Sequence, residues 1–166
     1  MADDYGGLLG AYPYAFRHSS SWLFRSYVVV SGLVGAFVAL LLVLGLITWL
    51  AGPTGLAGQN AFLGVIGILV LAPLAAPVLF VARRHRFETA RPAADRLFAL
   101  AGYLFLGSLY LALLITDPSH HSVSGPFRGV IAALDALPGT YGLIPPVIAA
   151  VAILLVARLT RPTAVD

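Results

Sequence analysis

The side chains best suited to acid–base or metal chemistry are four histidines, at positions 18, 85, 120 and 121. His120 and His121 follow Asp117 closely, and these three residues could form a weak metal site at the surface. Adjacent side chains point apart on most backbones, however, and no further ligand spacing supports such a site. We therefore interpret these residues as a solvated loop and expect no metal ion.

Catalytic motifs are missing from the sequence. It contains no phosphate-binding glycine loop, nucleophile elbow or zinc-protease helix, and no obvious nucleophile–base pair. Because there is no cysteine, thiolate metal sites, Fe–S clusters and cysteine nucleophiles are excluded. The long apolar stretches also lack histidines that could ligate haem. The sequence predicts no catalytic residue and no cofactor, and it does not favour an enzyme.

The composition indicates a membrane protein. Of the 166 residues, 60% are hydrophobic and only 10% are charged, whereas soluble domains average about 25% charged residues. The net charge of +3 comes from arginine alone, because the chain has no lysine. The arginines lie at the borders of apolar stretches without interleaved aromatic residues on which bases could stack, so we expect no nucleic-acid partner.

Four apolar stretches have the length of transmembrane helices, at residues of about 26–50, 61–82, 97–115 and 143–159. They predict an all-α integral membrane four-helix bundle in which residues 1–166 form a single transmembrane domain. Residues 1–21 are predicted to lie at the membrane interface, and their glycines and Pro13 argue against one long helix. The outer loop, residues 116–142, is predicted to carry a short interfacial helix, because its apolar residues recur on one helical face.

A basic segment at residues 83–96 separates two stretches without Asp, Glu, Lys, Arg or His, 26–82 and 97–116. It holds half of the ten arginines: Arg83, Arg84, Arg86, Arg91 and Arg96. The cluster either determines topology or binds anionic lipid headgroups. Glu88 and Asp95 are predicted to form exposed pairs with these arginines, worth about 0–1 kcal/mol each.

The arginines also predict an orientation. With four spans, nine of them fall on one side of the membrane and Arg128 on the other. The positive-inside rule then places both termini and the basic loop in the cytoplasm, in a multi-pass protein of the cell membrane.

Small residues recur within the predicted spans and favour close helix packing. Their partner is either another span of the same chain or a second copy; the candidates are Ser31, Gly35, Ala39, Gly64, Gly102 and Gly107. Pro73 and Pro77 predict a kink in the second span, either packed in place or acting as a hinge. Tyr103 and Tyr110 either mark a binding pocket or bond to a nearby carbonyl or serine.

Two blocks of sequence carry a family resemblance. They are residues 5–17, which begin Tyr-Gly-Gly-Leu-Leu-Gly, and the Ala-Pro-Leu-Ala-Ala-Pro stretch at 72–77 that leads to Arg83–Arg86. In these blocks the chain resembles uncharacterised small four-span membrane proteins of halophilic archaea. The resemblance implies a source for the protein and no site residues.

Two functional hypotheses follow from these features. The first is a non-enzymatic accessory or assembly subunit of a membrane complex, since small-residue faces and an aromatic N-terminal segment suit helix partners. The alternative is a binder or carrier of an apolar, lipid-like molecule in a gap left by the kinked span. The expected partners are membrane lipids and either other membrane subunits or a second copy of the chain.

Overall fold

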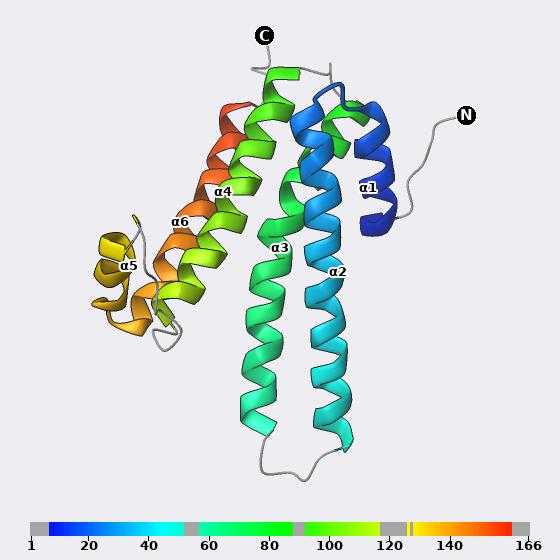
Figure 1. The fold of residues 1–166 in the computed structure, drawn as a ribbon. Helices are drawn as coiled ribbons and strands as arrows, with labels where there is room; N and C mark the ends of the chain where they lie inside the picture. The colour runs from blue at the N-terminus through cyan, green and yellow to red at the C-terminus, as the bar shows by residue number, and fades with distance from the viewer. Residues whose placement is uncertain (1–6, 52–56, 88–91, 117–125, 127, 161–166) are drawn as a thin grey trace. The chain divides into compact units, whose positions relative to one another are not determined.

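The structure, a computed structural model, describes residues 7–51, 57–87, 92–116, 126 and 128–160. The backbone alone is described for residues 57–66 and for Leu8, Leu9, Trp49, Ala51, Phe87 and Asp135. Regular structure in this part of the chain is entirely helical (Figure 1). The elements are α1 (Gly7–His18), α2 (Trp22–Ala51), α3 (Ala57–Phe87), α4 (Pro92–Thr116), α5 (Arg128–Asp135), the 3₁₀ helix η3 (Gly139–Leu143) and α6 (Ile144–Leu159).

Four helical stretches among the described residues are long and apolar enough to cross a membrane. They are Trp22–Thr48, Gly67–Arg86, Pro92–Thr116 and Gly139–Leu159. Each contains or overlaps one predicted span, and α5 is the short helix predicted in the last loop. The predicted all-α membrane fold is therefore confirmed.

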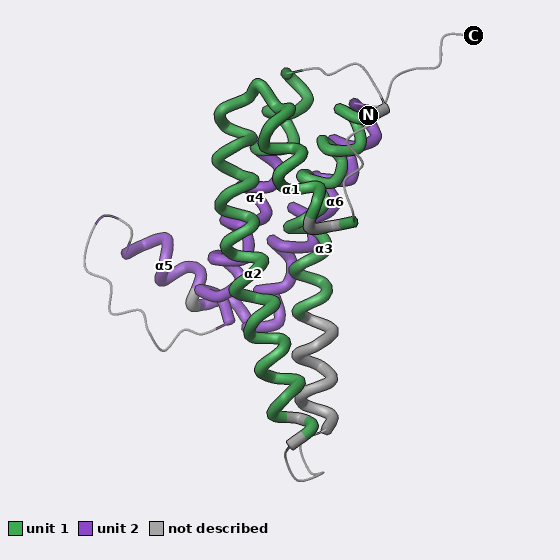
Figure 2. The backbone as a smooth tube through the Cα atoms, turned by 90° about the vertical axis from the view of Figure 1, so that its right-hand side faces the viewer, with its two compact units in different colours: residues 1–99 green, residues 100–166 purple. Residues whose placement is uncertain are grey.

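The chain divides into two compact units, residues 1–99 and residues 100–166 (Figure 2). Helix α4 crosses this division, with residues 92–99 in unit 1 and residues 100–116 in unit 2. The two units are described one at a time below.

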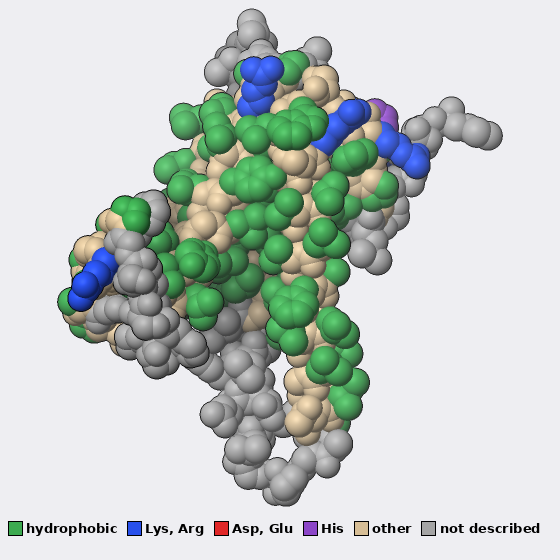
Figure 3. Space-filling model, viewed as in Figure 1, with side chains coloured by type: hydrophobic (Ala, Val, Ile, Leu, Met, Phe, Trp, Pro, Cys, Tyr) green, Lys and Arg blue, Asp and Glu red, His purple; other side chains and the backbone are tan. Residues whose placement is uncertain are grey.

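Unit 1 is built on α2 and α3, which pack side by side in opposite directions, with α1 against both (Figure 1). Its core gathers near the start of α2 and the end of α3, where Phe24, Tyr27 and Phe98 are fully buried. Phe80 of α3 stacks on Phe98 of α4 with ring centroids 5.7 Å apart. Further along, α2 is apolar on every side, and hydrophobic side chains cover its exposed surface (Figure 3). That pattern is typical of a helix that faces lipid.

Helix α1 differs from the expectation that glycines and a proline would interrupt residues 1–21. Residues 7–18 form a single helix that includes Gly10 and Pro13. Its small residues Ala11 and Ala15, one turn apart, are fully buried. Tyr12 lies against Gly32, which is about 15 Å along α2 from its first residue. Packing on α2 and α3 therefore outweighs the weak helix propensity of this segment.

The predicted basic loop at 83–96 is largely helical. Helix α3 continues to Phe87, and α4 begins at Pro92, so residues 88–91 separate the two helices. Arginine is a good helix former, and cations near a helix C-terminus interact favourably with the helix dipole. Pro92 occupies the first helical position of α4, where its missing N–H costs nothing.

Unit 2 contains the rest of α4 with α5, η3 and α6. Pro145 and Pro146 lie in the first turn of α6, a position that suits their fixed backbone angle. Gly142 of η3 packs directly on the end of α4. A Cβ atom on Gly142 would lie 2.5 Å from the Thr116 hydroxyl oxygen and 3.0 Å from the Ala112 carbonyl oxygen. Glycine at this position permits the close approach.

Candidate functional site

Ser19, Asp95 and the half-buried His85 form a polar cluster in unit 1, which we name the carboxylate clasp. The Ser19 hydroxyl donates to Asp95 Oδ2 at 2.7 Å. His85 Nε2 lies 3.0 Å from the same oxygen. Ser19 and Asp95 are only 1% and 2% exposed. One carboxylate oxygen thus joins the α1–α2 connection, the last turn of α3 and the first turn of α4.

Asp95 corrects one prediction. It was expected to form an exposed pair with neighbouring arginines, but it is buried, and its side-chain partners are Ser19 and His85. Sequence reasoning missed the clasp because hydrophobicity does not show which residues meet when α3 and α4 turn against each other. The available signal was a carboxylate three residues after a helix-starting proline, with a histidine in the preceding helix.

The order of the clasp residues argues against nucleophilic catalysis. A serine nucleophile needs a base such as histidine beside its hydroxyl, with the carboxylate behind the histidine. Here the carboxylate is central, and both Ser19 and His85 bond to it. The geometry therefore suits a structural connection between three segments. Among the residues that the structure describes, no group of histidines and carboxylates could hold a metal ion.

Serine caps the N-terminus of α2 at its connection with α1. The Ser21 hydroxyl accepts from the Phe24 backbone N–H at 3.3 Å. The Ser19 hydroxyl oxygen in turn accepts from the Ser21 N–H at 3.2 Å. Cap and clasp therefore share Ser19, which couples the start of α2 to Asp95.

A second polar contact lies between α2 and α3, near the proline pair. The Tyr27 hydroxyl donates to the Leu74 carbonyl at 2.7 Å. Pro77 cannot donate a backbone hydrogen bond, so the carbonyl of Pro73, the residue before Leu74, lacks its usual helical donor. Pro77 is buried and Pro73 is half-buried, and α3 continues through both. The predicted kink at Pro73 and Pro77 stays a prediction.

The small residues predicted to pack helices lie in different surroundings. Ser31 is buried, and Gly35 approaches the Leu71 and Leu74 side chains of α3. Ala39 is half-buried and Gly102 is buried. A Cβ on Gly107 would have nothing within 4 Å. For Gly64 the structure describes the backbone only.

Tyr12 connects α1 to the small-residue face of α2. Its hydroxyl is hydrogen-bonded to the Ser31 side chain. Burial raises the pKa of Tyr12, and the bond to Ser31 lowers it by a smaller amount. The phenol therefore stays neutral at physiological pH and serves as a packing residue of α1.

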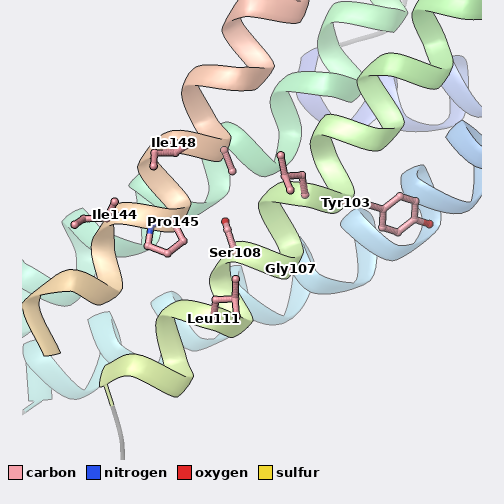
Figure 4. Close-up of a pocket in the computed structure, with 9 residues that line it drawn as sticks. Tyr103, Gly107, Ser108, Leu111, Ile144, Pro145 and Ile148 are labelled. Atoms are coloured by element: carbon pink, nitrogen blue, oxygen red, sulfur yellow. The ribbon is translucent and has the colours of Figure 1, made fainter. Parts of the chain in front are cut away.

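Unit 2 contains an apolar groove of about 490 Å³ between α4 and α6 (Figure 4). Its lining is Tyr103, Leu104, Gly107, Ser108, Leu111, Ile144, Pro145, Ile148 and Ala149. Ser108 donates to the Phe105 carbonyl at 2.6 Å, so its hydroxyl is already bonded within α4. The Tyr103 ring points away from α6 (Figure 4). Of the two mid-span tyrosines, Tyr103 lines this groove and Tyr110 is 63% exposed. Sequence reasoning missed the α6 half of the lining.

The predicted lipid-headgroup residues are distributed around the clasp. Arg83, Arg86 and Arg96 are exposed, and Arg84 is half-buried. Arg91 lies outside the described residues, as do Asp117, His120 and His121 of the candidate metal site. His18 is exposed and stacks on Tyr14 with ring centroids 4.1 Å apart.

Four helical stretches of the described chain that are long and apolar enough to cross a membrane define the class of this protein: an all-helical, multi-pass integral membrane protein. A family model described as "Domain of unknown function (DUF8056)" matches residues 1–161. The chain belongs to this family. It has no significant match among curated proteins and none among solved structures.

Proposed function

We propose that the protein binds the apolar chain of a lipid-like molecule in the groove of unit 2. The observation that carries this proposal is the groove itself, about 490 Å³ between α4 and α6. Small-molecule sites in proteins commonly measure about 300–1,000 Å³ and are mostly apolar. The groove volume falls within that range, and the groove lining is mostly apolar as well.

The lining indicates what kind of ligand the groove would take. Branched aliphatic side chains come from both helices, including Leu111 of α4 and Ile148 of α6. Gly107 leaves open space where any other residue would place a side chain. Because the Ser108 hydroxyl already bonds to Phe105, the groove offers little to a polar ligand. An apolar chain, recognised by its shape, is the ligand that suits this surface.

Filling the groove tests this proposal. Gly107→Leu would place an isobutyl group in the open space, whereas Gly45→Leu would fill similarly open space on α2, outside the groove lining. Native mass spectrometry of the purified protein is expected to show a stoichiometric lipid or quinone on the wild type and on Gly45→Leu. The Gly107→Leu variant should lose it. Wild-type protein without such a ligand in repeated preparations would contradict the proposal, as would equal retention by both variants.

The second candidate function is that of an accessory or assembly subunit. Two glycines with free space beside their Cα atoms, Gly45 and Gly107, favour it. Nothing lies within 4 Å of a Cβ on Gly45 or on Gly107. Small residues at exposed helix positions allow the helix of a partner to approach closely. Purification in mild detergent should then recover a complex or an oligomer that Gly45→Leu disrupts. A monomer without a co-purifying protein would count against this function.

We further propose that the arginine-bearing end of unit 1, together with both termini, faces the cytoplasm of a cell-membrane protein. The support is the positive-inside rule applied to short loops. The halophilic archaeal source implied by the family resemblance stays a prediction.

A further inference from the structure

The carboxylate clasp collects arginines at one end of unit 1. In the sequence, Ser19 lies between Arg17 and Arg25. His85 is surrounded by Arg83, Arg84 and Arg86. Arg96 directly follows Asp95. Because Ser19 and His85 both bond to Asp95, these three segments meet at one place. The end of unit 1 therefore carries arginines from four helices, α1 to α4.

The carboxylate of Asp95 does not neutralise the positive charge of the arginines at the surface of this end. Among the described residues of unit 1, Asp95 is the single carboxylate. It is 2% exposed, and its Oδ2 atom is shared by Ser19 and His85. A buried, hydrogen-bonded carboxylate cannot form surface pairs with exposed Arg17, Arg83 and Arg96. Over the described residues, an anion from outside therefore meets a basic surface.

Arg25 shows how the surface could hold a phosphate beside a membrane. Its Nε–H donates to the Phe16 carbonyl at 3.0 Å, and its guanidinium carbon lies 5.4 Å from the centre of the Phe16 ring. These contacts orient the guanidinium while its other N–H groups remain available to an anion, because arginine has five N–H donors. Trp22 is 81% exposed and Phe16 is 40% exposed. Exposed aromatic residues beside arginines are typical of the headgroup level of a bilayer.

We propose that this end of unit 1 is a binding surface for anionic phospholipid headgroups, built from Arg17, Arg25, Arg83, Arg86 and Arg96. Guanidinium groups recognise phosphate through paired N–H donors. The aromatic residues hold the surface at the depth where headgroups lie. This surface belongs to unit 1 and recognises charge, so it is independent of the apolar groove of unit 2.

Lipid competition on the purified full-length protein tests the surface. Equal amounts of dioleoylphosphatidylglycerol and dioleoylphosphatidylcholine are added in detergent, and native mass spectrometry measures the ratio of the two bound lipids. We expect the wild type to prefer phosphatidylglycerol. In the combined variant Arg25→Gln, Arg83→Gln, Arg96→Gln, the ratio of bound phosphatidylglycerol to bound phosphatidylcholine should fall about five-fold for each arginine removed. The corresponding Arg→Lys variant keeps the charge and should keep most of the preference.

Two controls assign the effect to this surface. Arg128→Gln removes one arginine charge from α5 of unit 2 and should leave the lipid preference unchanged. Gly107→Leu fills the groove of unit 2 and should also leave the lipid preference unchanged. A failure of the groove proposal can therefore be told apart from a failure of the headgroup surface. The proposal is overturned if the wild type binds both lipids equally, if Arg128→Gln has the same effect as the combined variant, or if equimolar inorganic phosphate displaces phosphatidylglycerol.

Discussion

The Nε2 atom of His85, in the last turn of α3, lies 3.0 Å from the Oδ2 atom of Asp95, in the first turn of α4. The Ser19 hydroxyl reaches the same oxygen from 76 residues away in the sequence. A buried carboxylate is costly unless hydrogen bonds compensate it, and here the Ser19 hydroxyl and the His85 ring both bond to Asp95. The clasp therefore determines how three segments of unit 1 meet.

The first prediction concerns Ser19. Its replacement by alanine removes one of the hydrogen bonds to Asp95, and bonds to charged groups are worth about 1.5–3 kcal/mol. Ser19→Ala should therefore lower the free energy of unfolding by about that amount, measured by denaturation in mixed detergent micelles. Ser20→Ala alters the adjacent exposed residue and should change stability by less than about 0.5 kcal/mol. Equal effects of the two substitutions would contradict the role of the clasp.

The second prediction concerns Tyr27. Tyr27→Phe leaves the buried Leu74 carbonyl without the phenol donor and should cost about 0.5–1.5 kcal/mol, since interhelical hydrogen bonds in membranes are of modest strength. Tyr110→Phe removes a hydroxyl from an exposed tyrosine and serves as the matched control. Thermal unfolding of both variants measures the difference. If Tyr110→Phe is the more destabilised, the Tyr27 bond does not stabilise the contact between α2 and α3.

The third prediction concerns the close approach at Gly142. A side chain there would meet the Thr116 hydroxyl and the Ala112 carbonyl, and the second of these is backbone that cannot rotate away. Gly142→Val should therefore destabilise unit 2 by about 1–3 kcal/mol, the usual cost of overpacking. Limited proteolysis between α4 and α6 should become faster. Gly129→Val, where a Cβ meets nothing within 4 Å, should leave the cleavage rate near that of the wild type.

The fourth prediction concerns orientation. Because the chain has no cysteine, Ser20→Cys, Thr54→Cys, Thr89→Cys and Thr140→Cys can be labelled without background. An impermeant thiol reagent on intact cells should label positions 54 and 140 and spare positions 20 and 89, since moving arginines through the apolar core is costly. The reverse pattern would overturn the orientation. Labelling of position 89 but not of position 20 would be inconsistent with α2 and α3 both crossing the membrane.

The membrane class and the approximate helices were determined by the sequence itself. Hydropathy is a property of consecutive residues, so the four apolar stretches indicate spans whatever they pack against. Local chemistry also accounts for the serine cap of α2, the start of α4 at Pro92 and the proline opening of α6. Helix α1 was missed because packing of Ala11 and Ala15 decides its conformation, and packing is not visible in local propensity.

Only the tertiary structure decided which polar groups and surfaces come together. Asp95 looked like one of several charges in a basic loop, and its burial depends on His85 arriving from α3 and Ser19 from the α1–α2 connection. The groove depends in the same way on α6 reaching Gly107 and Leu111 of α4. Hydrophobicity adds up residue by residue, whereas a hydrogen bond or a groove exists only where distant side chains meet in one geometry. The sequence therefore determined the class of the protein, and the tertiary contacts decided where its candidate sites lie.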